Sequence, residues 1–151
     1  MTEYVKLENL QSFDTEFKNS LGELEQRIFD CYSEIWRSDK DESTSEKTVR
    51  EQMFKEFKEN FGYATGGKKY LKLVTGAFGI GRHCQTSVWG FVAKQDFKVT
   101  NKKKSGGEFI NFKEGDILKA AGWNTPTLNA SRGNIFTDDY KVSWTGPQYL
   151  I

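Results

Sequence analysis

The sequence predicts an α+β fold in which an N-terminal antiparallel helical hairpin is followed by a mainly antiparallel β-sheet or partial barrel. Three observations support it: apolar residues recur with a helical period early in the chain, short stretches of β-forming residues follow, and the charge changes sign between the two parts. Residues 1–60 hold nine Lys and Arg against fifteen Asp and Glu, whereas residues 61–151 hold thirteen against six. We therefore divide the chain into an acidic helical arm, residues 1–62, and a basic, aromatic-rich β-module, residues 68–151.

In the helical arm, apolar side chains recur at steps of three and four, which is the period of one helix face. The stripe consists of Leu7, Leu10, Phe13, Phe17, Leu21, Leu24, Ile28, Tyr32 and Ile35. A polar turn follows at residues 38–45, and Ser43 with Glu46 fits a capping box at the start of a second helix that stops near Gly62. Two helices joined by a short polar loop predict an antiparallel hairpin. The stripe fits packing within the chain and also a coiled coil between subunits, and we expect the arm to support a homo-oligomer.

The β-module predicts strands because β-branched and aromatic residues alternate with other residues between turn signals. Residues 70–74 and 87–93 form two such stretches, and residues 97–100 and 108–112 predict a hairpin. Residues 116–121 fit a strand or a short helix, and residues 134–136 with 140–144 predict a last hairpin. Because no long helical stretch separates these segments, parallel crossovers are not expected and the sheet should be antiparallel.

The residues able to carry out catalysis do not form a recognisable catalytic pattern. The single histidine, His83, precedes Cys84, and neighbouring residues on an extended segment point to opposite faces. One histidine and two cysteines do not complete a four-ligand zinc site. The acids Glu108, Glu114 and Asp116 lack the spacing of a metal-dependent nuclease. We therefore expect no enzyme and assign no catalytic residues, no metal ligands and no cofactor.

Basic residues in the β-module cluster on flexible connections. Lys102, Lys103 and Lys104 occupy the tip between two predicted strands, and Arg82 ends a glycine-rich loop. Lysines near phosphates release counterions and add salt-dependent affinity, and bare backbone N–H groups of a glycine-rich loop can cradle a phosphate. With Lys98 on the adjoining strand, these residues predict a phosphate-binding face.

Aromatic residues in the same module are candidates for stacking on unpaired bases. These are Trp89, Phe91 and Trp123, and Arg132 lies in a glycine-flanked loop between aromatic segments. Aromatic side chains on a sheet suit splayed bases, and no helix here is basic enough to enter a major groove. The sequence therefore predicts a non-enzymatic protein that binds single-stranded nucleic acid, RNA or DNA. The alternative is a protein-binding inhibitor or adaptor of host machinery that acts through the acidic helices.

The last part of the chain carries a pattern of tryptophan, proline and glycine: Trp123 and Pro126, then R-G-N-I at residues 132–135, then W-T-G-P-x-Y-L at residues 144–150. This pattern resembles the C-terminal signature of small uncharacterised bacteriophage proteins. The resemblance implies a bacteriophage protein that acts in the host cytoplasm. Long apolar runs and a secretory leader are not evident in the sequence, so we expect a cytoplasmic protein without a membrane partner.

Overall fold

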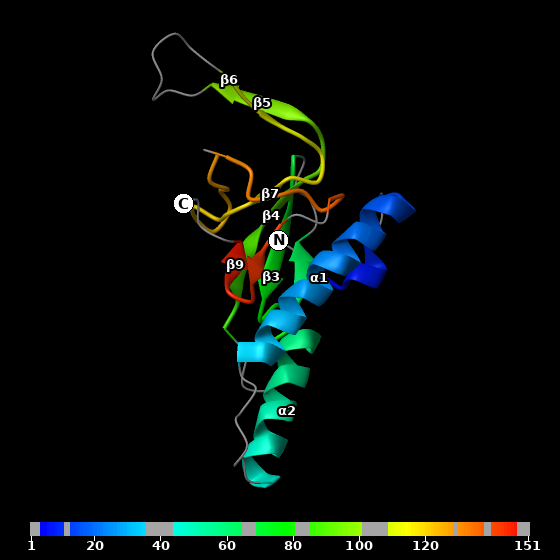
Figure 1. The fold of residues 1–151 in the computed structure, drawn as a ribbon, viewed down its shortest axis with the longest axis vertical. Helices are drawn as coiled ribbons and strands as arrows, with labels where there is room; N and C mark the ends of the chain where they lie inside the picture. The colour runs from blue at the N-terminus through cyan, green and yellow to red at the C-terminus, as the bar shows by residue number, and fades with distance from the viewer. Residues whose placement is uncertain are drawn as a thin grey trace.

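The centre of the molecule is an antiparallel sheet with the strand order β1-β2-β3-β4-β7. The computed structural model describes residues 4–10, 13–35, 44–64, 69–80, 85–100, 109–128, 130–137 and 140–147. The strands of the sheet are β1 (Tyr4–Val5), β2 (Gly62–Ala64), β3 (Tyr70–Thr75), β4 (Ser87–Ala93) and β7 (Ile117–Leu118). Helix α1 runs along the side of the sheet and α2 stands at one end of the molecule, whereas a two-stranded ribbon lies at the other end (Figure 1).

Helix α1 (Thr15–Ile35) forms where the apolar stripe predicts a helix, but it begins later than the stripe. Leu7–Asn9 is a short 3₁₀ helix, and the Asp14 carboxylate caps α1 by accepting a hydrogen bond from the Phe17 N–H at 2.8 Å. Capping of this kind satisfies a backbone donor that has no partner within the helix. The buried members of the stripe are Phe17, Leu21, Leu24, Ile28 and Tyr32.

The prediction of an N-terminal antiparallel helical hairpin is wrong. In a hairpin, the end of α1 would lie beside the start of α2 (Thr44–Glu59). Instead, aromatic rings at the end of α1 contact rings in the later turns of α2. Tyr32 stacks on Phe57 with ring centroids 4.4 Å apart, and Phe29 meets Phe57 edge-on at 6.0 Å. The first turns of α2 extend beyond α1 (Figure 1).

The physical reason is that the stripe of α1 has a larger apolar partner than α2. The stripe joins one cluster with the sheet residues Tyr63, Leu71, Leu73, Val92 and Ile117. The chain also begins with β1, which pairs with β2, so the first residues belong to the sheet rather than to a helical arm. The hydrophobic effect has no preferred direction and scales with the apolar area that is buried. The stripe therefore packs on the apolar face of the sheet.

The opposite face of the sheet is covered as well, by a second cluster of buried residues. Phe91, Phe112 and Leu118 form its centre, and the half-buried Tyr70 and Phe97 pack against them. Both faces of β4 are therefore buried, which gives this strand an almost continuous run of buried residues.

The last predicted hairpin is also wrong. Residues 134–136 do not pair with residues 140–144; instead β8 (Val142–Ser143) pairs with β9 (Gly146–Pro147). Asn134 bridges to Asp116, whose Oδ1 accepts a hydrogen bond from the Asn134 Nδ2 at 3.0 Å. β9 packs closely on β4 because Gly90 has no side chain: a Cβ there would lie 3.1 Å from the Pro147 ring of β9.

Between α1 and the edge of the sheet, Glu25 lies in a poorly solvated position. Burial raises the pKa of Glu25 to about 7, although the charge of Lys6 acts to lower it. The folded state therefore keeps a proton that the unfolded state releases between about pH 4.5 and pH 7. By linkage, the free energy of unfolding falls as the pH rises through this window and levels off above it.

We expect Glu25→Gln to stabilise the protein by about 2 kcal/mol at pH 8 and to have little effect at pH 5, because an amide needs no proton to remain uncharged. Denaturant unfolding of both proteins at the two pH values measures this difference. Glu51→Gln makes the same chemical change at an exposed position on α2 and is the matched control. An equal effect of Glu25→Gln at both pH values would contradict the assignment.

Candidate nucleic-acid interface

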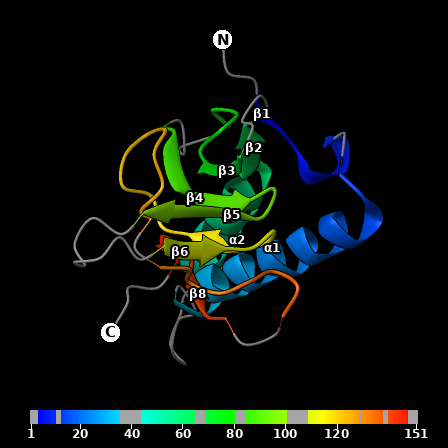
Figure 2. The same cartoon turned by 90° about the horizontal axis from the view of Figure 1, so that it is seen from above.

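The ribbon, which is not hydrogen-bonded to the five-stranded sheet, consists of β5 (Phe97–Thr100) and β6 (Phe109–Phe112), as the sequence predicts. Its register pairs Phe97 with Phe112 and Thr100 with Phe109. Because successive side chains of a strand point to opposite sides, the ribbon has two different faces. Figure 2 shows the ribbon lying over the sheet, on the side away from α2.

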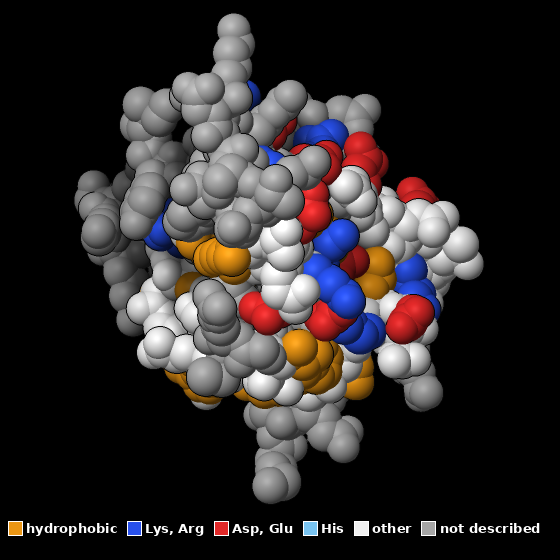
Figure 3. Space-filling model, turned by 90° about the horizontal axis from the view of Figure 1, so that it is seen from below, with side chains coloured by type: hydrophobic (Ala, Val, Ile, Leu, Met, Phe, Trp, Pro, Cys, Tyr) orange, Lys and Arg blue, Asp and Glu red, His pale blue; other side chains and the backbone are white. Residues whose placement is uncertain are grey.

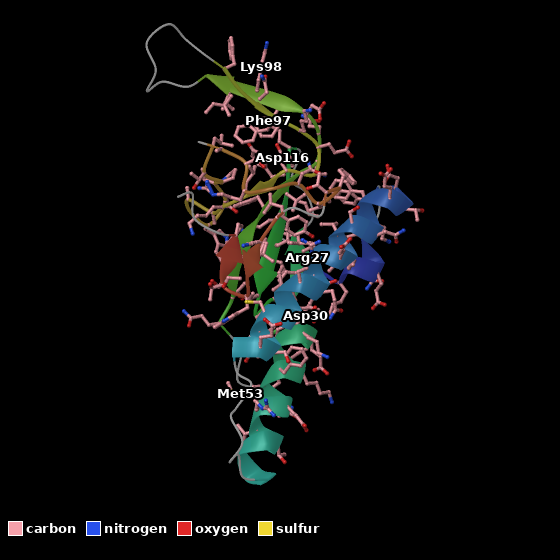
Figure 4. All side chains as sticks on the ribbon, in the orientation of Figure 1. Arg27, Asp30, Met53, Phe97, Lys98 and Asp116 are labelled. Carbon is pink, nitrogen blue, oxygen red and sulfur yellow. The ribbon has the colours of Figure 1, made fainter. Side chains whose placement is uncertain are left out.

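The inner face of the ribbon anchors it to the second cluster. The rings of Phe97 and Phe112 stack with centroids 4.9 Å apart, and Phe97 meets Tyr70 edge-on at 5.5 Å. Figure 4 shows Phe97 directed back toward the sheet. Aromatic pairs of this kind contribute beyond the area they bury, so the ribbon is held in a defined position.

The outer face of the ribbon carries Lys98, Phe109 and Asn111, all exposed, and we call these three residues the ribbon surface. Phe109 is 56% exposed, the largest value for any large hydrophobic residue in the described part of the chain. The Lys98 Nζ lies 4.8 Å from the centroid of the Phe109 ring, and Figure 4 shows Lys98 directed away from the body. A cation beside an exposed ring can bind a phosphate and its neighbouring base together.

The chain between the two strands, which holds Lys102, Lys103 and Lys104, lies outside the described residues. Arg82 lies outside them too. The predicted role of these four side chains in phosphate binding therefore stays a prediction.

A second candidate element is the loop of residues 121–125, which we call the Trp123 loop. It is closed at its base by a bridge between Ala120 and Pro126 and by the hydrogen bond from the Ala121 N–H to the Thr125 carbonyl at 2.8 Å. Trp123 is 47% exposed at its tip. A short closed loop fixes the position of an exposed ring. Little conformational entropy is then lost when a base stacks on that ring.

Beneath the Trp123 loop lies Lys72, a lysine that is 6% exposed. It lies on β3 in the same row as Phe91, and its Nζ is 3.9 Å from the centroid of the Trp123 indole. The Nζ donates a hydrogen bond to the Asn124 Oδ1 at 2.9 Å. Burial lowers the pKa of Lys72. The contacts of the Lys72 ammonium group with the indole face and with the amide oxygen compensate for its loss of hydration.

The Trp123 loop lies toward one end of the ribbon. In Figures 1 and 2 the loop is found on the side where β5 ends and β6 begins.

The expectation that Trp89 and Phe91 stack on bases is not met. Trp89 is 2% exposed and Phe91 is 3% exposed, because helices cover one face of β4 and the ribbon covers the other. The Trp89 Nε1 donates a hydrogen bond to the Ser143 carbonyl at 2.8 Å, which satisfies its polar atom inside the core. Both residues are structural.

Arg132 is less accessible than the sequence predicts. It is half-buried, its Nε and Nη1 atoms are shielded from solvent, and burial lowers the pKa of its guanidinium. Its backbone N–H donates to the Ile117 carbonyl at 2.8 Å, which ties the segment to β7. We therefore leave Arg132 out of the interface.

Sequence reasoning missed Phe109, Asn111, Lys72 and Asn124. The first two could have been found, because the predicted hairpin register places them on the same face as Lys98. Lys72 and Asn124 are far apart in the chain and meet through the fold.

Comparison of the chain with protein-family models, with curated proteins and with solved structures finds no match. Within the described residues, no group of three or more His, Cys, Asp or Glu side chains is placed to hold a metal ion. The described helices are too short or too polar to cross a membrane.

Proposed function

We propose that this chain is a non-enzymatic protein that binds single-stranded RNA or DNA. The observation that carries the proposal is the ribbon surface, where the most exposed large ring of the described residues, Phe109, lies beside the exposed Lys98. Exposing a phenyl ring costs free energy in water, and a stacked base would cover it.

In this proposal Lys98 contacts the phosphate backbone while Phe109 stacks on a base, and Trp123 provides a second stacking position. Stacking requires access to the face of a base, which is free in a single strand and covered in a duplex. The arrangement therefore favours single strands, and base identity has little effect at the ribbon surface because every base has a stacking face.

The proposal is tested by the fluorescence anisotropy of short labelled oligonucleotides, single-stranded and duplex, titrated with the protein at several salt concentrations. We expect binding to single strands that weakens steeply with salt, and weaker binding to the duplex of equal length. Absence of binding at low salt, or affinity that salt does not change, would overturn the proposal.

A second function is favoured by the outer face of α1. Glu16, Glu23 and Asp30 follow one another at steps of seven residues, with Glu34 one turn further, and all four are exposed. A line of carboxylates resembles the charge of a nucleic-acid strand and suits a basic protein partner. If the chain acts this way, replacing Asp30 and Glu34 by lysine abolishes association with a basic protein and leaves oligonucleotide binding intact.

A further inference from the structure

The contact between Lys72 and Asn124 determines which way the Asn124 amide faces. A lysine ammonium group has three donors and no acceptor. The amide atom 2.9 Å from the Lys72 Nζ must therefore be the oxygen, Oδ1. Consequently the Nδ2 group, with its two donors, is left for solvent or a ligand. Asn124 is exposed, so this group is accessible.

The exposed donor is adjacent in sequence to the exposed ring of Trp123. The Trp123 loop is closed at its base, and the Gly122 N–H also donates to the Thr125 carbonyl at 3.1 Å. Lys72 holds both residues from below, through the indole face and the amide oxygen. A planar group stacked on Trp123 would thus present its edge to a donor whose orientation is already fixed.

We propose that the Trp123 loop binds a pyrimidine base with carbonyl oxygens on its edge, uracil in RNA or thymine in DNA, in preference to adenine. This inference rests on the proposed binding of single strands and adds base selectivity to it. The base stacks on the Trp123 ring while the Asn124 Nδ2 donates to one of its carbonyl oxygens.

Adenine is disfavoured for a specific reason. Asparagine reads adenine through a pair of hydrogen bonds in which the amide oxygen accepts from the exocyclic amino group. At Asn124 that oxygen is turned toward the buried Lys72, which occupies one of its two lone pairs, so it does not face a base together with the exposed Nδ2 group. Uracil and thymine carry no exocyclic amino group and offer two carbonyl oxygens, so they match an amide that presents its donors.

The test compares the affinities for short oligouridylate and oligoadenylate, and for the corresponding oligothymidylate and oligodeoxyadenylate, in wild type, Asn124→Asp and Asn111→Asp. Asn124→Asp keeps an acceptor for Lys72 but removes the donor. Asn111→Asp makes the same chemical change on the ribbon surface. We expect wild type to prefer uridylate by about fivefold, the value of one hydrogen bond. This preference should vanish in Asn124→Asp and persist in Asn111→Asp, although both carboxylates weaken binding overall.

The outcomes separate the two proposals. If wild type binds neither uridylate nor adenylate, the proposed function fails and the selectivity fails with it. If wild type binds both equally, or if Asn124→Asp keeps the preference, the selectivity alone is overturned. The RNA and DNA pairs show whether uracil or thymine is the better ligand.

Discussion

Replacing Gly133 with alanine is expected to lower the free energy of unfolding by about 3 kcal/mol or more. Gly133 has a φ of +133°, a backbone conformation that residues with a side chain rarely adopt. A Cβ at this position would collide with the Cβ of Tyr140, a buried core residue. The backbone strain and the overpacking each cost about 1–3 kcal/mol. The Gly133 carbonyl also accepts a hydrogen bond from the Ile117 N–H at 2.8 Å, so a shift here disturbs β7.

Chemical denaturation followed by circular dichroism measures this loss, and Gly22→Ala provides the matched control. Gly22 lies inside α1, and a Cβ there would make ordinary contact with the Leu7 Cδ2 at 3.6 Å. Alanine at this position should stabilise the protein by about 0.5–1 kcal/mol, because glycine is the poorer helix former. A Gly133→Ala variant as stable as wild type would contradict the close approach of Gly133 to the Tyr140 side chain.

Loss of both exposed rings is expected to have the largest effect on binding. Stacking of a base on an aromatic side chain contributes about 1–3 kcal/mol, and effects at separated sites add. The double substitution Phe109→Ala with Trp123→Ala should therefore weaken the binding of single strands by at least about thirtyfold. Because both side chains are about half exposed, the loss of stability should be small.

Phe78→Ala is the control for this pair. Phe78 is 37% exposed and has the Lys6 Nζ at 5.3 Å from its ring centroid, so it combines a ring and a cation as the ribbon surface does. It lies in the connection between β3 and β4 rather than on the ribbon or the Trp123 loop. We expect its removal to leave the affinity unchanged. An equal loss in Phe78→Ala would mean that binding is not localised to the proposed interface.

Local pattern in the sequence predicts several elements well. The strand at residues 87–93 and the hairpin formed by β5 and β6 follow from alternation and turn signals that lie within the segment itself. The apolar stripe likewise predicts most of α1. These features depend on neighbours in sequence, which a single chain displays directly.

Packing partners could not be predicted in the same way. The stripe of α1 required an apolar surface, and the sheet and α2 both offered one. The burial of Trp89 and Phe91 depends on cover from both sides of β4, contributed by distant segments. Lys98 was predicted within the interface, whereas the contact of Lys72 with Asn124 joins residues that only the fold brings together. Self-association through the helices stays a prediction.

The control for Lys98 is a lysine on α2, at the end of the molecule opposite the ribbon. Figure 3 shows basic and acidic side chains next to one another on the α2 end. Lys55 lies there, with a side chain that is 66% exposed, and it pairs with Glu59 at 3.9 Å. Its replacement changes the net charge of the chain as Lys98→Ala does, but far from the ribbon surface.

The most direct test of the proposed interface is the salt dependence of single-strand binding in wild type, Lys98→Ala and Lys55→Ala. Each phosphate contact contributes about 0.7 to the slope of log affinity against log salt concentration for single strands. We predict that Lys98→Ala lowers the magnitude of this slope by about 0.7 and that Lys55→Ala leaves it unchanged. Equal slopes in all three proteins would contradict the account, because Lys98 would then make no phosphate contact.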